Sequence, residues 1–240
     1  MGLGALVLCL VCAVFYRNPD KVEIPLAEGK IANDAAPKPS AVSQMATLFK
    51  SRDIWMLFLA GFFLNIVEWG MMTNLVLYLK ESLLFGVVAA GGLLAMTEAA
   101  GALGKPASGL VSDRLLKGQR KVVFMLMASV AVLISLVLGL VGHQIEWLLY
   151  PVLLIFGLMA IGWGGLYTAL VGELAGKDLA GIAAGTGGFM LVLGAMTGPP
   201  LFGFIVDYTG SYEVAWLFMA LSGALSVGFM SLVREYRKRI

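Results

Sequence analysis

Six long stretches of this sequence are apolar along their whole length and almost free of charge, and no other feature limits the possible folds as strongly. Four of them contain no Asp, Glu, Lys or Arg, and the other two contain one acidic residue each. A helix needs about 20 mostly apolar residues to cross the hydrocarbon core of a bilayer. Each stretch therefore predicts a membrane-spanning helix: Ile54–Leu79, Gly86–Gly104, Val122–Gly142, Trp147–Gly172, Leu179–Val206 and Val214–Val233.

The composition agrees with an all-α membrane protein and disfavours several other classes. Hydrophobic residues make up 60% of the chain and charged residues 13%, with a mean hydropathy of +0.89, whereas soluble domains are roughly 45–50% apolar and about 25% charged. A net charge of +2 shows no basic excess that would indicate nucleic acid. His143 is the only histidine, which disfavours a zinc site or a Ser–His hydrolase. We therefore expect neither an enzyme nor a metal or cofactor site.

The N-terminal part of the chain differs from the rest. Met1–Tyr16 is apolar but short, and it lacks the basic start and cleavage site of a signal peptide, so we expect a partial span. Residues 17–53 are rich in proline and charge and predict a cytoplasmic linker. Within it, Ala41–Lys50 fits either a surface helix or an unstructured tether. Residues 54–233 then form the six-span part, and residues 234–240 a basic tail.

The distribution of Lys and Arg predicts the orientation, because loops rich in these residues stay in the cytoplasm. With the linker inside, only Lys80 lies outside, and Lys105 lies near the inner end of its span. This places the C-terminus in the cytoplasm and predicts a multi-pass protein of the plasma (inner) membrane. The cytoplasmic residues are Arg17, Lys21, Lys30, Lys38, Lys50, Arg52, Arg114, Lys117, Arg120, Lys121, Lys177, Arg234, Arg237, Lys238 and Arg239.

A short pattern recurs at a fixed offset along the chain. Gly109–Asp113 and Gly203–Asp207 both read G-x-x-x-D, and they lie 94 positions apart. The same shift carries Ile54, where the first predicted span begins, to Leu148, near the start of the fourth. Because the two copies fall at opposite membrane faces, the pattern predicts two inverted repeats of three helices, an arrangement found in secondary transporters.

The first copy extends into Gly109-Leu-Val-Ser-Asp113-Arg114-Leu-Leu-Lys-Gly118-Gln-Arg120-Lys121. This segment resembles the signature loop of the major facilitator superfamily, although three residues between Arg114 and Gly118 make its spacing looser than usual. Leu48–Trp55, Gly198–Gly203 and Asp207–Tyr212 extend the likeness over nearly the whole chain. The resemblance implies the C-terminal half of such a transporter, from its sixth span through its twelfth.

A gating role for this loop is the first functional hypothesis. Asp113 and Arg114 lie at a helix end, where charge-assisted hydrogen bonds to neighbouring helices can break and re-form. Glu173 is a natural partner for Arg114 or Arg120. The alternative is that these charges only fix the orientation of the spans. The residues of the gating motif are Gly109, Asp113, Arg114, Gly118, Arg120, Lys121 and Glu173.

The two acidic residues inside spans are the strongest candidates for binding solute or protons. Glu68 and Glu98 lie near the middle of their spans, where a charge costs at least about 2.5 kcal/mol and faces a cavity or a partner. Asn65 shares the helix face of Glu68, and Lys105 shares that of Glu98, so an ion pair between Glu98 and Lys105 is conceivable. Desolvation favours a neutral carboxyl group, which suits exchange of protons. The alternative is a structural hydrogen bond between helices.

Aromatic and glycine residues add weaker signals. Trp163 and Tyr167 lie four apart and away from the interfaces, where they form either one wall of a binding site or part of the core. Glycine pairs four apart, Gly181 with Gly185 and Gly194 with Gly198, favour close helix packing. Gly198-Pro199-Pro200 then predicts a bend or break in its helix, or tight packing without any hinge.

These features together predict secondary active transport of a small organic solute by alternating access, as a proton-coupled symporter. The expected partners are the lipid bilayer, the solute, and either a missing N-terminal half or a second copy, with no nucleic acid. The alternative is a truncated remnant or assembly partner that keeps the fold without transporting. Length distinguishes the two, because transporters of this family have twelve spans and this chain predicts six and a partial one.

Overall fold

The computed structural model describes residues 48–141 and 146–234. The chain divides into two units, Met1–Pro39 and Ser40–Ile240, and every described residue belongs to the second. The predicted N-terminal span, nearly all of the linker with its possible surface helix at Ala41–Lys50, and the basic tail beyond Arg234 lie outside the described residues.

The described part of the chain is helical, as predicted, and contains no strand. Each predicted span lies within a helical stretch to within one or two residues, because a backbone in hydrocarbon must satisfy its own hydrogen bonds. The helices are α3 (Arg52–Glu81), α4 (Val87–Leu110) with a π-helical turn η1 (Val111–Leu115), α5 (Arg120–Val141), the 3-10 turn η3 (Glu146–Leu148), α6 (Leu149–Ile161), α7 (Gly164–Thr209) and α8 (Tyr212–Leu232).

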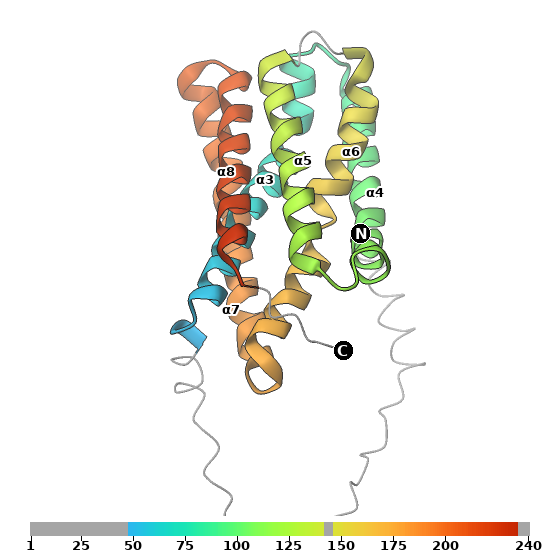
Figure 1. Ribbon diagram of the computed structural model, residues 1–240. Coiled ribbons are helices and arrows are strands. Elements are labelled where there is room, and N and C mark those ends of the chain that lie inside the picture. The colour runs from blue at the N-terminus through green and yellow to red at the C-terminus, as the bar shows by residue number, and fades with distance from the viewer. Residues whose placement is uncertain (1–47, 142–145, 235–240) are drawn as a thin grey trace, which may run out of the picture. The chain divides into compact units, whose positions relative to one another are not determined.

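Helix α7 crosses the membrane layer more than once. Its 46 residues would measure about 70 Å at 1.5 Å per residue, more than twice the hydrocarbon thickness. Gly176 interrupts it with φ 74° and ψ 171°, a conformation that glycine adopts without strain. Figure 1 shows α7 turning back on itself at the lower end of the bundle. Residues 164–175 therefore complete the span that α6 begins, and residues 177–209 return across.

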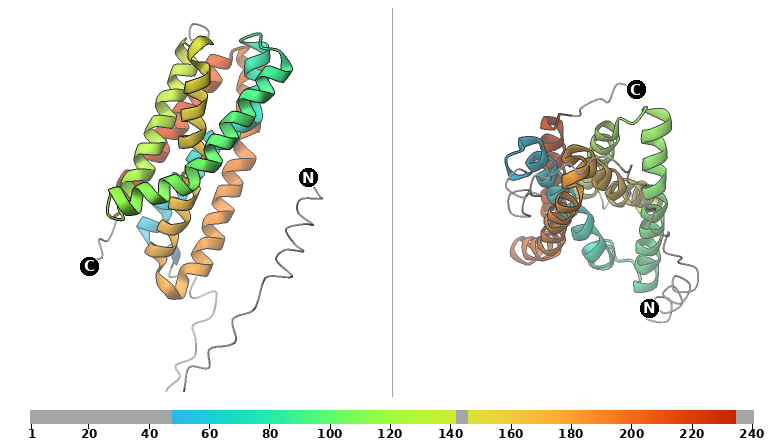
Figure 2. Two further views of the ribbon diagram at one scale, coloured as in Figure 1. Left: turned by 90° about the vertical axis from the view of Figure 1, so that its right-hand side faces the viewer. Right: turned by 90° about the horizontal axis from the view of Figure 1, so that it is seen from below.

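The described residues thus cross the membrane layer six times. Five helical stretches are long and apolar enough to span a bilayer, and the longest, Leu149–Thr209, contains the reversal at Gly176 and so counts twice. Helix α4 is the least enclosed span: 33% of its apolar window is buried, against 61% for α3. Figure 2 shows α4 along one side of the bundle.

The packing of the helices follows an inverted repeat. Helix α3 packs along the second segment of α7, α4 packs along α6, and α5 packs along α8. The first triplet is α3, α4 and α5. The second is α6 with the first segment of α7, then the second segment of α7, then α8. The first helix of each triplet packs on the second helix of the other, and the two third helices pack together. The triplets begin at opposite ends of the bundle (Figure 1), so the predicted inversion is confirmed.

Two equivalent glycines show the repeat at atomic detail. A Cβ atom on Gly104 would lie 2.6 Å from the Leu158 carbonyl oxygen, and one on Gly198 would lie 2.5 Å from the Ile66 carbonyl oxygen. Both approaches exclude any side chain and bring two helix backbones into contact. Gly104 and Gly198 are themselves 94 positions apart, the offset of the G-x-x-x-D pattern. The predicted packing role of Gly194 and Gly198 is confirmed, whereas Gly181 and Gly185 face open space.

The predicted break at Pro199-Pro200 does not occur. The chain stays helical through both prolines, and the one non-helical residue of α7 is Gly176. Gly198 lies directly against α3, and this close packing holds the helix through the two residues that donate no backbone hydrogen bond. The tight-packing alternative is therefore the one observed.

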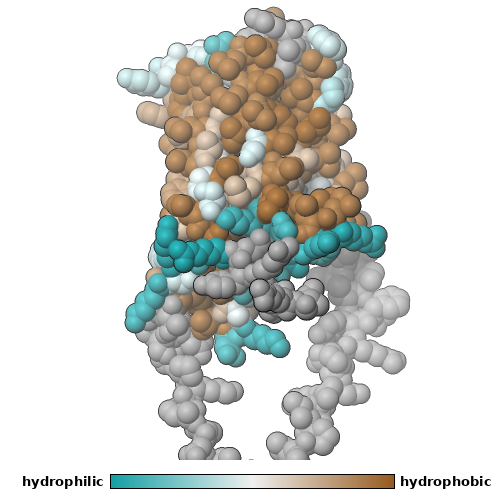
Figure 3. All heavy atoms as spheres, viewed as in Figure 1, coloured by the Kyte–Doolittle hydropathy of each residue, from teal (hydrophilic) through white to brown (hydrophobic). Residues whose placement is uncertain are grey.

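The two ends of the bundle differ in their residues. We call the end with Arg52, Arg120, Lys121, Lys177 and Arg234 the basic end, and the end with Glu81 and residues 209–212 the aromatic end. On the face shown in Figure 3, a broad hydrophobic belt ends in a hydrophilic band at the basic end. Exposed Leu, Val and Phe side chains cover this belt, as expected of a surface in contact with lipid.

Candidate functional site

Gly61, Asn65 and Glu68 form a stripe on one face of α3, and this stripe packs against protein. The side-chain amide of Asn65 donates a hydrogen bond to the Leu191 carbonyl oxygen in the second segment of α7, and Asn65 is buried. One turn earlier, Gly61 packs so tightly on the Tyr167 ring that no side chain would fit. Glu68 follows one turn after Asn65 and is half-buried. The stripe therefore lies along the contact between α3 and α7.

A break in the fourth span lies beside this stripe. Helix α6 ends at Ile161 and α7 begins at Gly164, which leaves carbonyl groups of the last turn of α6 without their helical partners. The Trp163 indole N–H donates to the Ala160 carbonyl oxygen at 2.8 Å, and the Ser108 hydroxyl of α4 donates to the Gly162 carbonyl oxygen at 2.8 Å. Side chains therefore satisfy the broken helix inside the membrane layer.

Three helices bring charged and aromatic groups together at this break. The Glu68 carboxyl group lies beside the Trp163 indole, and the Lys105 ammonium of α4 is close enough to act on it electrostatically. The Trp163 and Tyr167 rings meet edge to face, 5.7 Å apart. Both rings are almost fully buried, and the Tyr167 hydroxyl donates to the Gly187 carbonyl oxygen at 3.2 Å. The two aromatic residues are thus packed in the core next to the site, which is the core alternative of the sequence analysis.

Glu98 lies apart from this group. Its side chain is exposed on α4, and within the part of the chain that the structure describes no ion pair joins it to Lys105. The conceivable pairing of Glu98 with Lys105 is therefore not found. Lys105 acts electrostatically on Glu68, without an ion pair between the two among the described residues. Sequence reasoning missed Lys105 and Ser108 as neighbours of the site, because periodicity within one helix carries no information about contacts between helices.

The loop motif forms a charged network at the basic end. Arg120, the first residue of α5, lies 2.9 Å from a Glu173 carboxylate oxygen in the first segment of α7, and 3.7 Å from one of Asp113 in η1. The expected pairing of Glu173 with one of two arginines is thus found with Arg120. The Arg120 side chain is 25% exposed and the Glu173 side chain 52%. Water therefore reaches the network and weakens its ion pairs.

The turn before Arg120 depends on a left-handed glycine. Gly118 has a φ of 81°, and its N–H donates to the Ser112 carbonyl oxygen at 2.8 Å. Lys117 precedes it with a φ of 51°, an uncommon value for a residue with a side chain. This turn connects η1 to α5 and brings the Arg120 guanidinium near the Asp113 carboxylate.

The remaining residues of the loop motif lie outside this network. Arg114 is exposed, and no ion pair joins it to any residue that the structure describes. The Lys121 ammonium donates to the Ser231 and Val233 carbonyl oxygens at the end of α8. Gly109 faces open space. Of the two arginines expected as partners of Glu173, Arg120 is therefore the one that bridges Glu173 and Asp113.

Comparisons with known proteins identify the fold. The Major Facilitator Superfamily model matches residues 1–195. An uncharacterized MFS-type transporter of Mycobacterium tuberculosis is 30% identical over 193 residues, 79% of this chain and 42% of that protein. The "Probable L-galactonate transporter" of Escherichia coli is 22% identical, over 98% of this chain and 54% of its own length. The crystal structure of the Escherichia coli fucose:proton symporter aligns with a TM-score of 0.72 at 17% identity, covering 96% of this chain and 53% of that one.

The chain spans about half the length of the curated relatives it matches. These relatives are named as transporters and not as enzymes. The six crossings and the match to the fucose:proton symporter describe an integral, multi-pass membrane protein. Because the family model matches most of its length, this chain belongs to the major facilitator superfamily and forms part of such a domain.

Proposed function

We propose that this chain is the C-terminal half of a secondary transporter that moves a small organic anion together with a proton by alternating access. The observation that carries the proposal is the placement of Glu68 beside Lys105 and Trp163 at a broken span. The basic end then faces the cytoplasm of the plasma (inner) membrane, because Lys and Arg collect there.

The electrostatic attraction between Glu68 and Lys105 supplies a way to couple proton and anion. When Glu68 is ionised, its carboxylate attracts the Lys105 ammonium. When Glu68 takes up a proton, that attraction disappears and Lys105 becomes available to a carboxylate of the solute. Proton and anion then bind together and leave together, which is symport. Asn65 and the Trp163–Tyr167 pair hold α3 and α7 around the site, and Glu98, on the exposed face of α4, is a second candidate for handling the proton.

The relatives support an anionic solute. One is named for L-galactonate, and another from Escherichia coli, at 22% identity, for galactarate and D-glucarate. A relative from Cupriavidus necator at 28% identity is named for sulfoacetate. All of these solutes are small organic anions, and Lys105 is a cation placed to meet one.

The network of Asp113, Arg120 and Glu173 acts as the gate of the basic end. It joins η1, α5 and the first segment of α7, with Gly109, Arg114, Gly118 and Lys121 shaping and flanking the same loop. Exposed ion pairs contribute only about 0–1 kcal/mol. A gate of this kind can open without a large barrier.

The second half of the transporter is supplied by an N-terminal half or by a second copy of this chain. The surface that would receive it includes α4 and the second segment of α7, where Gly91, Gly181 and Gly185 face open space. Val192 and Met196 are exposed on the same segment of α7, at 54% and 69%. A close-packed partner would bury these residues.

Transport in proteoliposomes tests the proposal. The chain is reconstituted alone and together with the N-terminal half of the Escherichia coli L-galactonate relative, and uptake of L-galactonate and D-glucarate is driven by a proton gradient. We expect Glu68→Gln to abolish proton-driven uptake but to keep solute exchange, since the neutral side chain mimics the protonated state. Glu213→Gln, which removes a carboxylate at the aromatic end, is the matched control.

Two results would count against the proposal. Unchanged proton-driven uptake by Glu68→Gln would remove Glu68 from the coupling mechanism. No uptake in either arrangement, with the fold intact by circular dichroism, would favour the non-transporting assembly partner.

A further inference from the structure

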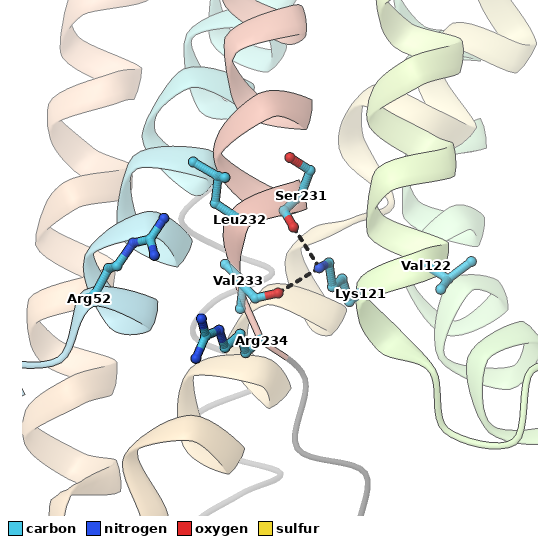
Figure 4. Close-up of a pocket in the computed structure, with 7 residues that line it drawn as sticks. All are labelled: Arg52, Lys121, Val122, Ser231, Leu232, Val233 and Arg234. Atoms are coloured by element: carbon cyan, nitrogen blue, oxygen red, sulfur yellow. Dashed lines mark hydrogen bonds between the residues drawn. The ribbon is translucent and has the colours of Figure 1, made fainter.

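An open pocket lies at the basic end, and its lining includes neither Glu68 nor any of Asp113, Arg120 and Glu173. Its volume is about 680 Å³, and it is formed where α3 begins, α5 begins and α8 ends. Figure 4 shows Arg52 and Lys121 on either side of the end of α8. The lining residues are Arg52, Lys121, Val122, Ser231, Leu232, Val233 and Arg234.

The polar side of this pocket is positively charged. Arg52 and Arg234 are both exposed, and neither guanidinium forms an ion pair with any residue in the ranges 48–141 and 146–234. The Asp53 carboxylate, at the start of α3, accepts the backbone N–H of Arg234 at 3.4 Å. Two guanidinium groups at one pocket match the geometry of a phosphate, which they can bind through paired N–H donors.

Lys121 holds the wall of the pocket in place. Its ammonium donates to the Ser231 and Val233 carbonyl oxygens (Figure 4), which a helix leaves without partners at its C-terminus. This lysine therefore ties α5 to the end of α8, and it fixes the position from which Arg234 reaches the pocket.

The other side of the pocket is apolar and is continuous with the exposed hydrophobic surface of the bundle. Val122 is 41% exposed and Leu232 is 47% exposed, and both line the pocket. Leu126 continues this surface one turn further into the membrane layer and is 56% exposed. A ligand that fits both sides carries a negative charge at one end and hydrocarbon at the other.

We propose that this pocket binds the headgroup phosphate of an anionic phospholipid from the leaflet at the basic end. Arg52 and Arg234 bind the phosphate, and an acyl chain lies along Val122, Leu126 and Leu232. Basic pockets between membrane helices bind anionic lipid headgroups in this way. A free phosphate ion would gain nothing from the apolar side, so the lipid is the better match. The bound lipid joins the start of α3 to the end of α8.

Lipid retention by the full 240-residue chain tests the site. The protein is reconstituted in phosphatidylcholine vesicles with and without phosphatidylglycerol, extracted gently, and analysed by native mass spectrometry for retained phosphatidylglycerol. We expect Arg52→Gln with Arg234→Gln to weaken retention roughly 30-fold, the effect of losing two cations that each contribute about 1 kcal/mol by direct contact with the bound headgroup. Arg234→Gln alone, beyond the end of α8, should weaken it about fivefold and leave folding unchanged.

The matched control is Lys117→Gln with Lys177→Gln, which removes the same charge from the same end but outside the pocket. We expect this control to retain phosphatidylglycerol as the unaltered chain does, and Arg52→Lys with Arg234→Lys to retain it better than the double Gln variant. Equal losses in the Arg→Gln pair and the control pair would show diffuse surface charge and overturn the site. No loss in any variant would also overturn it. If inorganic phosphate displaces phosphatidylglycerol from the unaltered chain, the pocket binds free anions and the lipid assignment is wrong.

Discussion

The two ends of the bundle hold their helices together differently, although Asp113 at one end and Asp207 at the other are equivalent positions of the inverted repeat. At the basic end, Arg120 joins the carboxylates of Asp113 and Glu173. At the aromatic end, the Tyr212 hydroxyl donates to a Glu81 carboxylate oxygen at 2.7 Å, and Asp207 is close enough to act on Tyr212 electrostatically. A carboxylate is therefore bound at each end, by a guanidinium at one and by a phenol at the other.

The surroundings of the two bridges differ even more. Tyr212 belongs to an aromatic cluster with Tyr78, Phe156, Phe202 and Trp216, which comes from α3, α6, α7 and α8. Arg120 has no such cluster and is partly solvated. Ring packing is directional and insensitive to salt, whereas exposed ion pairs are weak and screened. Under the proposed gating role of the Arg120 network, we therefore expect the aromatic end to be the more stable of the two.

Loss of the central ring of the cluster has the largest expected effect. Trp216 is 0% exposed, and truncating a buried Trp to Ala typically costs about 3–5 kcal/mol because the neighbours relax only partly. We expect Trp216→Ala to lower the thermal unfolding midpoint in detergent more than any change at the basic end. Trp216→Phe is the control: it keeps a ring, and the indole N–H has no partner among the residues described, so little is lost. A stable Trp216→Ala protein would contradict a packed aromatic end.

The phenol bridge has an intermediate expected effect. Tyr212→Phe removes the hydrogen bond to Glu81 but keeps the ring contacts with Tyr78 and Phe202, which predicts a loss of about 1 kcal/mol. The loss should persist at high salt, because the donor is neutral. Tyr208→Phe, at an 82% exposed side chain of the same end, is the matched control. Equal stability of the two variants would show that the bridge contributes nothing.

The guanidinium bridge has the smallest expected effect on stability. A double-mutant cycle of Arg120→Gln and Glu173→Gln should give a coupling of about 0.5 kcal/mol. At about 1 M salt, where the screening length is near 3 Å, the coupling should approach zero. A cycle that pairs Arg114→Gln with Glu173→Gln should give no coupling at any salt concentration. A coupling larger than the Tyr212 effect, or one that resists salt, would reverse the comparison between the two ends.

Much of the fold was predictable from periodicity and charge alone. The ends of α3, α5 and α8 fall within a few residues of the predicted spans, since the thickness of the bilayer sets the length of an apolar helix. The offset between the G-x-x-x-D copies predicted the inverted repeat, which the contacts at Gly104 and Gly198 confirm. The helix through Pro199 and Pro200 was not predictable, because the packing of Gly198 on α3 outweighs the local effect of proline.

The sequence by itself determined how many times the described chain crosses the membrane layer and where its acidic residues lie along the spans. Only the tertiary structure decided which residues meet: Glu68 with Trp163, within electrostatic reach of Lys105, Arg120 rather than Arg114 with Glu173, and Lys121 with the end of α8. The physical reason is that hydropathy acts on each helix separately, through its transfer into lipid. Which residues of two helices meet depends on how each helix is rotated about its axis and on how closely the helices approach at small residues such as Gly104. Neither can be derived from the sequence of one helix.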